Sequence, residues 1–336
     1  MKVDGGLMGT DIAAVPDRAR ELEGLGYDGA LTAETSHDPF LPALLGLEHT
    51  SRLQVGTGIA VAFARSPMTT ANLAYDLQRY SGGRFILGLG SQIKPHIEKR
   101  FSMPWSHPAA RMREFILAMR AIWASWDTDG TLDFRGDFYT HTLMTPFFNP
   151  GPNPFGAPPV FLAAVGEKMT ETAGEVADGV IVHGFTTERY LREVTLPALR
   201  RGLARSGRTR ADVEVSGPIF VVTAPTEEQF EKAKAATKQQ IAFYGSTPAY
   251  RGVLELHGWG DLQPELNRLS KQGEWVAMGD LVTDDILDTF AVVAEPEAVG
   301  RALHARFGDV VDRISFYAPY EGDPERWARV IADLRG

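Results

Sequence analysis

The sequence contains no cysteine, and this absence removes three kinds of chemistry at once. Disulfide bonds, thiolate nucleophiles and cysteine-ligated metal ions all require that side chain. The absence is compatible with a reducing compartment. A cysteine-poor lineage would explain it equally well, so this feature alone does not locate the protein.

The chain also lacks dense runs of one charge and long apolar stretches. Lys and Arg number 34 and Asp and Glu 43, for a net charge of −9. The basic residues are scattered, which argues against a nucleic-acid partner or an anionic membrane surface. No stretch reaches the ~18 uncharged residues that a bilayer span needs, and no signal-peptide core follows Met1–Gly6. We therefore expect a cytoplasmic protein.

The chain does contain a regular alternation of short apolar runs and longer amphipathic ones. With 44% hydrophobic residues it can bury a large core. The short runs are rich in Val, Ile, Leu and Phe, as buried parallel strands are, and the longer runs fit covering helices. The pattern predicts a (β/α)8 TIM barrel that forms a single α/β domain over residues 1–336. The eight candidate strands are Lys2–Met8, Gly29–Glu34, Leu53–Ala60, Phe85–Gly90, Val160–Gly166, Gly179–Gly184, Val213–Val222 and Arg313–Ala318.

Two stretches exceed what a minimal barrel needs, one after the fourth helix and one after the seventh. Thr128–Pro159 is rich in Gly, Pro and aromatic residues, and Asp133–Tyr139 within it predicts a short hairpin. Pro248–Asp285 carries Trp and Leu residues at spacings that fit one or two helices. Insertions of this length are usually lids or subunit contacts.

Two acid-proline-acid triplets predict where late helices begin. They are Glu295-Pro296-Glu297 and Asp323-Pro324-Glu325. Proline at the first helical position costs nothing because its missing N–H would be unpaired there, and an acid is favourable near the positive end of the helix dipole. We expect helices to start at both triplets.

Barrels of this type carry their active sites at the carboxyl ends of the strands, so we expect the functional residues there. The second strand ends in two acids and a histidine, Glu34, His37 and Asp38. One interpretation is a helix start, since Asp38-Pro39 is a good capping signal. The other is that Glu34 or His37 orients a cofactor ring or passes a proton.

The third and fourth strands end in small residues. Paired glycines at Gly56 and Gly58 weaken a strand unless a ligand or another backbone approaches closely, although a glycine bulge without function is the alternative. The segment Gly88–Gln92 also opens the rim with small residues. It lacks the downstream part of a dinucleotide fingerprint, and no Walker-type phosphate loop occurs in the chain.

The fifth and sixth strands lead directly into helices, at Ala163–Gly166 and His183–Thr187. Backbone N–H groups at such helix starts can hold a phosphate without a lysine, although ordinary βα turns would look the same. Histidines at positions 37, 96, 107 and 183 lack the spacings of metal sites, so we expect no metal.

Three of these segments together resemble the luciferase-like monooxygenase superfamily over nearly the whole chain. They are Gly56–Pro67, Ser81–Ser91 and Ala173–Gly179, which look like the family's third strand, its fourth strand and its approach to the sixth. The branch that looks most similar is the F420-dependent oxidoreductases. The resemblance implies F420 as cofactor and a preference for homodimers.

The resemblance also implies where the cofactor lies. The family's third strand holds a non-prolyl cis peptide that bulges against the deazaflavin ring, and Gly58–Ile59 occupies the matching place. By the same resemblance, Val61, Ser91 and Gln92 line the ring and its ribityl chain. The resemblance also implies that two segments bind the cofactor phosphate and its tail. The first is Ala163, Ala164, Val165 and Gly166, and the second is His183, Gly184, Phe185 and Thr186.

The implied reaction is a hydride transfer between C5 of the deazaflavin and a small organic substrate. The sequence signatures of the family's sugar-phosphate-oxidising members differ here, so the resemblance does not imply a sugar phosphate as the substrate. Glu34, His37 and His96 remain the nearest acid–base candidates, and Glu34 and His37 are the residues that we predict to be catalytic. The alternatives are an FMN-dependent monooxygenase on the same scaffold and a flavin- or deazaflavin-binding protein without turnover.

Overall fold

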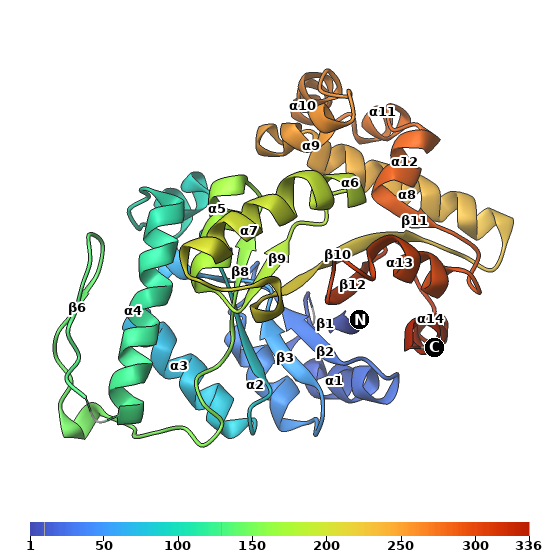
Figure 1. The fold of residues 1–336 in the computed structure, drawn as a ribbon. Coiled ribbons are helices and arrows are strands. Elements are labelled where there is room, and N and C mark those ends of the chain that lie inside the picture. The colour runs from blue at the N-terminus through green and yellow to red at the C-terminus, as the bar shows by residue number, and fades with distance from the viewer. Residues whose placement is uncertain (10, 129, 336) are drawn as a thin grey trace.

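Parallel strands form the main sheet of the molecule, and eight of them close into a ring (Figure 1). The computed structural model describes residues 1–9, 11–128 and 130–335. The strands of this sheet are β1 Lys2–Gly6, β2 Gly29–Thr32, β3 Gln54–Thr57, β4 Ala60–Val61, β5 Phe85–Gly90, β8 Val160–Ala164, β9 Gly179–Val182, β10 Glu214–Val222, β11 Ala291–Val293 and β12 Arg313–Tyr317. The ring runs β1, β2, β3, β5, β8, β9, β10, β12 and back to β1. Outside that path, β4 pairs with β5 and β11 with β10.

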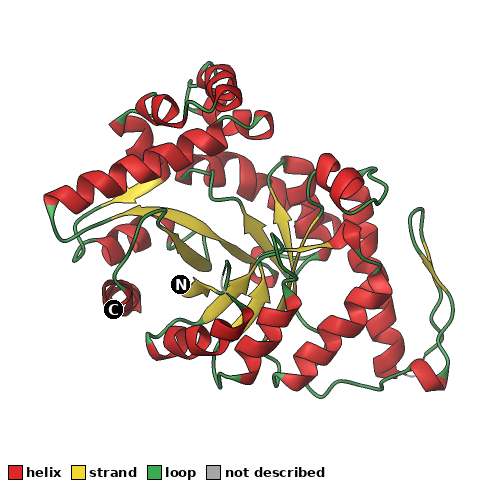
Figure 2. Ribbon diagram, turned by 180° about the vertical axis from the view of Figure 1, so that it is seen from behind, coloured by secondary structure: helices red, strands yellow, loops and turns green. Residues whose placement is uncertain are grey.

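Helices cover the outside of the ring, as Figure 2 shows from behind. A parallel sheet needs such a layer because both of its faces are apolar, and all six residues of β5 are buried. The helices are α1 Val15–Gly24, α2 Phe40–Glu48, α3 Pro67–Tyr80, α4 Pro108–Thr128, α5 Glu167–Val176, α6 Glu188–Tyr190, α7 Leu196–Arg205, α8 Glu227–Gly245, α9 Arg251–Leu256, α10 Leu262–Gln272, α11 Trp275–Asp280, α12 Asp284–Phe290, α13 Val299–Phe307 and α14 Pro324–Arg335. Short 3₁₀ or π turns lie at Ile12–Ala14, Ala62–Ala64, His96–Arg100, Pro146–Phe148, Leu191–Thr195, Arg210–Asp212 and Pro248–Tyr250.

The predicted (β/α)8 barrel is confirmed, since all eight predicted strands are in the ring. Several strands end earlier than predicted because the chain leaves the sheet at the rim; β2, for example, ends at Thr32. One predicted helix start is wrong. Residues 296–298 form a separate turn, closed by the bond from the Ala298 N–H to the Glu295 carbonyl, so α13 begins at Val299. The predicted start at Pro324 is confirmed.

Both predicted insertions are present. The first contains the predicted hairpin, in which β6 Phe134–Arg135 pairs with β7 Thr140–His141, and it extends away from the barrel in Figure 1. Further along it, the side chains of Phe147 and Phe148 are exposed. The second insertion holds α9, α10, α11 and the start of α12, which is more than the one or two helices predicted. Together with α8 and the end of β10, these helices bury a second hydrophobic cluster. We call the segment from α8 to α12, including the 3₁₀ turn Pro248–Tyr250, the helical cap.

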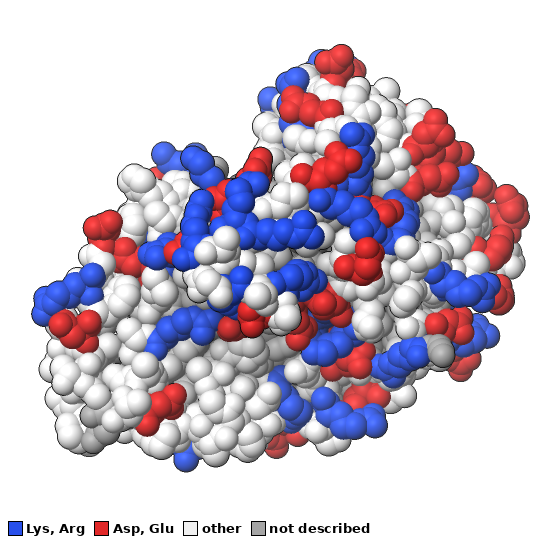
Figure 3. Space-filling model, viewed as in Figure 1, with Lys and Arg blue, Asp and Glu red and all other residues white. Residues whose placement is uncertain are grey.

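Charges of both signs are spread over the face shown in Figure 3, where a band of Lys and Arg crosses the middle. Arginines in this protein commonly have local partners: Arg201 and Arg205 of α7 reach Glu171 of α5 at 2.7 and 2.6 Å. Such pairs neutralise basic charge within the surface itself. None of the helices in the described ranges is both long and apolar enough to cross a bilayer.

A buried ion pair joins the first and last strands of the ring. Arg313 begins β12, is 1% exposed, and donates from Nε to Oδ2 of Asp4 on β1. Its Nη2 donates to Oε1 of Gln54 at 2.9 Å, and its Nη1 lies 3.4 Å from Oε2 of Glu214. One guanidinium group therefore ties together β12, β1, β3 and β10.

The same pair explains the glycine that begins β2. A Cβ atom at Gly29 would lie 2.4 Å from Oδ1 of Asp4, 2.7 Å from Nη2 of Arg313 and 2.9 Å from the carbonyl oxygen of Gln54. Those atoms are fixed by the ion pair and by the sheet. A side chain at this position would therefore separate the charges that close the ring.

We predict that Arg313→Met lowers the free energy of unfolding by about 3–5 kcal/mol, because it leaves the Asp4 carboxylate buried without its partner. The double variant Asp4→Leu with Arg313→Met is expected to recover most of that loss, since it removes both buried charges. Urea unfolding measures both values. Lys2→Ala is the control, because the Lys2–Glu214 pair is exposed and worth less than about 1 kcal/mol. A double variant as unstable as the single one would contradict the prediction.

Candidate active site

The chain bulges directly after β3, where it meets β5. The peptide bond between Gly58 and Ile59 is cis, which confirms the prediction made for this position. Before the bulge, Thr57 continues the ladder with its side chain: its Oγ1 donates to the Gly88 carbonyl at 2.6 Å and accepts from the Gly88 N–H at 3.0 Å. A Cβ at Gly88 would lie 1.7 Å from the Thr57 carbonyl oxygen, so only glycine allows the two strands to come this close.

Glu34 bonds the backbone at Ile59 and just beyond it. Its backbone N–H donates to the Ile59 carbonyl at 3.1 Å, and its Oε2 accepts from the Val61 N–H at 2.7 Å. The same oxygen accepts from Nη1 of Arg65 at 2.5 Å. The Glu34 side chain is only 7% exposed. The carboxylate is thus committed to the backbone beyond the bulge and to one arginine, which is the geometry of a positioning residue.

The other members of the predicted cluster face outward. His37 is exposed. Asp38 accepts from the Phe40 N–H at 2.8 Å, at the start of α2, and from Nη2 of Arg65 at 3.0 Å. The helix-start interpretation therefore describes Asp38, and Arg65 connects that start to the bulge.

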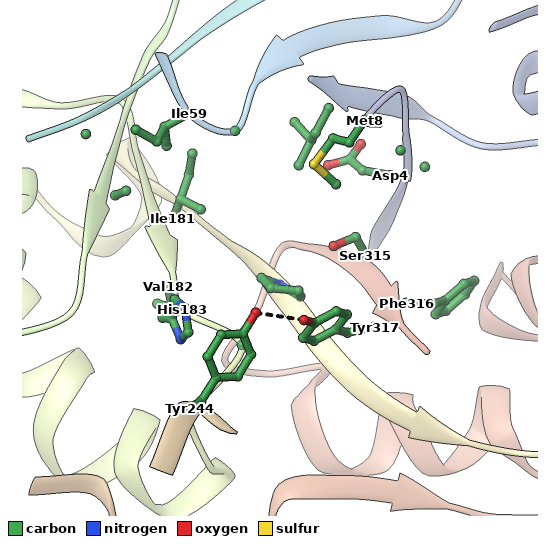
Figure 4. A pocket seen from close by; sticks show the side chains of 18 of the residues that line it. Asp4, Met8, Ile59, Ile181, Val182, His183, Tyr244, Ser315, Phe316 and Tyr317 are labelled. Carbon is green, nitrogen blue, oxygen red and sulfur yellow. Dashed lines mark hydrogen bonds between the residues drawn. The ribbon is translucent and has the colours of Figure 1, made fainter. Parts of the chain in front are cut away.

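A cavity of about 700 Å³ opens at the carboxyl ends of the ring strands (Figure 4). Its volume lies within the range of roughly 300–1,000 Å³ that is usual for small-molecule sites. Ile59 lines it, and Figure 4 places Ile181 and Tyr317 around the same space. The structure brings together at this cavity the following residues of the predicted cofactor set: Gly58, Ile59, Ser91, Gln92, Ala163, Ala164, Val165, His183 and Gly184.

Six of the predicted site residues lie outside the lining of this cavity: Glu34, His37, Val61, Gly166, Phe185 and Thr186. Val61 is buried in β4, and Phe185 is 2% exposed within the helical cap cluster. Gly166 is the N-cap residue of α5, and a Cβ there would meet no atom within 4 Å. The buried Oγ1 of Thr186 has no hydrogen-bond partner among the described residues.

The structure adds three tyrosines that the strand-end reading missed. Tyr317 ends β12, Tyr244 lies near the end of α8, and Tyr250 closes the 3₁₀ turn after it. All three line the cavity together with His183, and we call these four residues the His–Tyr cluster. Applying the strand-end rule to the eighth strand would have found Tyr317. Tyr244 and Tyr250 belong to the helical cap, whose position over the rim no local pattern indicates.

His183 is held as a neutral imidazole. The backbone N–H of Phe185 donates to its Nδ1 at 3.0 Å, so its proton is on Nε2. The ring stacks on Tyr250 at 4.5 Å and meets Tyr244 edge-on at 4.7 Å between centroids. Burial lowers the pKa of His183 to about 4. Across the described residues, no cluster of three or more His, Asp or Glu side chains could hold a metal ion.

The chain is thus a closed (β/α)8 barrel with a cavity at the carboxyl ends of its strands, the place where enzymes of this fold have their active sites. The chain belongs to the luciferase-like monooxygenase family, whose model matches residues 2–313. Membership in this family and the reductases among its relatives support the general class of oxidoreductase.

The relatives include characterised and uncharacterised proteins. An uncharacterised protein of Mycobacterium tuberculosis is 59% identical over 314 residues, which are 94% of this chain and 92% of that protein. A 5,10-methylenetetrahydromethanopterin reductase of Archaeoglobus fulgidus is 27% identical over 274 residues, 79% of this chain and 74% of the relative.

Solved structures share the fold. The F420-dependent tetrahydromethanopterin reductase of Methanopyrus kandleri matches with a TM-score of 0.80 at 21% identity, over 99% of this chain and 97% of the other. An F420-dependent secondary alcohol dehydrogenase matches with 0.75 at 16% identity, over 100% and 99% of the two chains. A type II Baeyer–Villiger monooxygenase from Pseudomonas putida, in complex with FMN, matches with 0.68 at 16% identity, over 98% and 96%.

The environment of His183 predicts how stability depends on pH. Its pKa is about 6.5 in the unfolded chain and about 4 in the folded one, so the unfolded state binds the extra proton between these values. We therefore expect this residue to cost stability as the pH falls from about 6.5 to about 4, by at most about 1.4 kcal/mol per pH unit. Urea unfolding across that range measures the effect.

The matched control is His183→Asn, whose amide oxygen can still accept from the Phe185 N–H but which does not titrate. The difference in unfolding free energy between the wild type and this variant should change below pH 6.5. A difference that stays constant over the whole range would show that His183 is not held neutral.

Proposed function

We propose that this protein is an F420-dependent oxidoreductase that transfers a hydride between the deazaflavin and a small organic substrate. The observation that carries the proposal is the bulge at Gly58–Ile59, which Glu34 fixes in place and which forms one wall of the cavity. Two structural neighbours are F420-dependent enzymes, which supports the choice of cofactor.

The residues present fit such a cofactor. The cavity has room for a flat ring system, and its apolar wall at Ile59 suits a ring face. Gly166 leaves open space at the N-terminus of α5, where the helix dipole favours an anion, and the unpartnered Oγ1 of Thr186 is a hydrogen-bonding group for a phosphate or its tail. We propose that these residues, with Ala163–Val165, hold the phosphate, and that Ser91 and Gln92 line the ring and its ribityl chain.

When bound, F420 would supply the hydride chemistry, and the side chains of the protein would do the rest. Ile59 would support the ring, and the helical cap would cover the cavity and keep water out of it. Proton transfer by Glu34 and His37 stays a prediction. The contacts of Glu34 favour a positioning role, because its oxygen is already bonded to Val61 and Arg65.

FMN is the second candidate cofactor, because a monooxygenase of the same fold is bound to FMN. A binding protein without turnover is the third candidate.

The cytoplasmic location and the homodimer also stay predictions. Phe147 and Phe148 of the first insertion are adjacent and exposed, and such a contiguous apolar surface supports contact with a second copy.

We predict that the protein binds F420 more tightly than FMN, and fluorescence titration with each compound measures both dissociation constants. Gly166→Asp is expected to weaken binding of F420 and of FMN by about 10-fold, because a carboxylate beside the phosphate repels it. Riboflavin, which has no phosphate, should bind the variant as it binds the wild type. Aspartate is a good N-cap residue, so the fold should not suffer.

Tighter binding of FMN than of F420 would move the proposal to the flavin alternative. Equal loss of riboflavin and F420 affinity in Gly166→Asp would show that α5 does not hold the phosphate. Tight binding of F420 with no turnover of any substrate would favour the binding protein.

We predict that Glu34→Gln weakens F420 binding several-fold and lowers the unfolding free energy by about 1–3 kcal/mol, because Arg65 loses a buried charged partner. His37→Asn should change neither quantity, since His37 is exposed. Asp38→Asn is the matched control, because it alters the other partner of Arg65 without touching Val61. If turnover instead falls by roughly 10²–10⁴-fold with affinity unchanged, Glu34 is a general acid–base group.

A further inference from the structure

Two tyrosine hydroxyls meet where the helical cap reaches the barrel. The side chain of Tyr244 extends from α8 toward Tyr317 at the end of β12, and the two hydroxyl oxygens lie 2.7 Å apart (Figure 4). The two residues are 73 positions apart in the chain, and both line the cavity. This contact is formed only when cap and barrel are assembled, and neither the bulge nor the predicted phosphate site uses it.

The hydroxyl pair can donate one hydrogen bond to a ligand. Each hydroxyl has one proton, one of the two protons lies between the oxygens, and the second remains available. Burial, together with the hydrogen bond that it shares with Tyr244, raises the pKa of Tyr317 well above its usual value. Tyr317 is therefore neutral at physiological pH and presents an O–H group rather than a phenolate.

His183 adds a second neutral donor to the same wall. Its Nδ1 is occupied by the Phe185 N–H, which leaves the proton on Nε2. Its ring is fixed between Tyr244 and Tyr250. The His–Tyr cluster thus offers O–H and N–H groups without a formal charge.

Formal charge is scarce around this space and is already paired. Among the described residues that line the cavity, Asp4 is the one carboxyl side chain and Arg18 the one guanidinium side chain, and lysine is absent. Asp4 belongs to the buried pair with Arg313, and Arg18 donates to Glu21 at 2.7 Å on the surface of α1. A carboxylate or phosphate on the substrate would therefore enter a site with no free cation, and its desolvation would not be offset.

We propose that Tyr244, Tyr317 and His183 hold the oxygen atom of a neutral carbonyl or hydroxyl substrate. The inference rests on the proposed function and adds the substrate class to it. The apolar and aromatic remainder of the lining, including Ile181, Phe316 and Trp327, suits a hydrocarbon body around that oxygen. The His–Tyr cluster selects against substrates that are acids or phosphate esters, whereas the phosphate of the cofactor is assigned to Ala163–Val165 and the N-terminus of α5.

The test uses three probes of similar size, acetophenone, benzoate and ethylbenzene, which carry a neutral carbonyl, an anion and no oxygen. Ligand-observed NMR measures their affinity for the whole protein, with and without saturating F420. We expect acetophenone to bind at least about 10-fold more tightly than benzoate. The double variant Tyr244→Phe with Tyr317→Phe should lose about 5- to 10-fold in acetophenone affinity, the usual effect of one hydrogen bond, and bind ethylbenzene as before.

Tyr27→Phe is the matched control, because it removes a hydroxyl from another tyrosine of the same lining. It should leave acetophenone binding unchanged. Melting temperatures show whether each variant is folded. If the double variant is unfolded, the single variant Tyr317→Phe and the comparison of acetophenone with benzoate on the wild type test the substrate class instead.

The outcomes separate this inference from the proposed function. If F420 binds the wild type but the double variant keeps full affinity for acetophenone, or benzoate binds as well as acetophenone, the substrate class is wrong and the cofactor assignment stands. If F420 does not bind, while acetophenone still depends on the two hydroxyls, the oxygen site stands and the proposed function is wrong.

Discussion

The ion pair between Asp4 and Arg313 links ring closure to the cavity. Arg313 reaches four strands from one buried position, and Asp4, its partner, is also part of the cavity lining. Charge at this depth is tolerated because each ion has a partner at hydrogen-bond distance. The fixed strands in turn set the rim, so that the bulge, the helix starts after β8 and β9 and the end of β12 surround one space.

At the rim, the described side chains of the site mainly bind the backbone and hold it in place, and few of them are exposed reactive groups. Glu34 bonds the chain at Ile59 and at Val61, directly after Gly58, and Thr57 replaces part of the β3–β5 ladder just before it. A redox cofactor brings its own reactivity, so the task of the protein is to place the ring and the substrate. A buried Glu34 whose Oε2 is already bonded to Val61 and Arg65 fits that task better than it fits proton transfer.

The donors that face the cavity are uncharged. Burial keeps His183 neutral and the hydroxyl of Tyr317 protonated, while Asp4 and Arg18 of the lining have partners of their own. An enclosed space with neutral donors and an apolar wall favours ligands that lose little free energy when they leave water. That desolvation cost is small for a carbonyl and large for an anion. The helical cap supplies one of these three donors, Tyr244, so recognition depends on its packing against the barrel.

The sequence by itself determined the eight strands, their order in a (β/α)8 ring and both insertions, and it led to the luciferase-like family, whose resemblance implied the position of the cis peptide. These features are local: a continuous apolar run of five residues or a glycine pair is visible in the chain without its neighbours. Even the errors were local, since α13 starts three residues late because a turn precedes it. Only the tertiary structure decided that Glu34 faces the bulge, that His37 faces solvent and that Tyr244 meets Tyr317. The Glu34 and Tyr244 contacts join segments 27 and 73 residues apart. Their geometry is set by the packing of neighbouring strand ends in the first case and of cap against barrel in the second, and by no spacing within a segment.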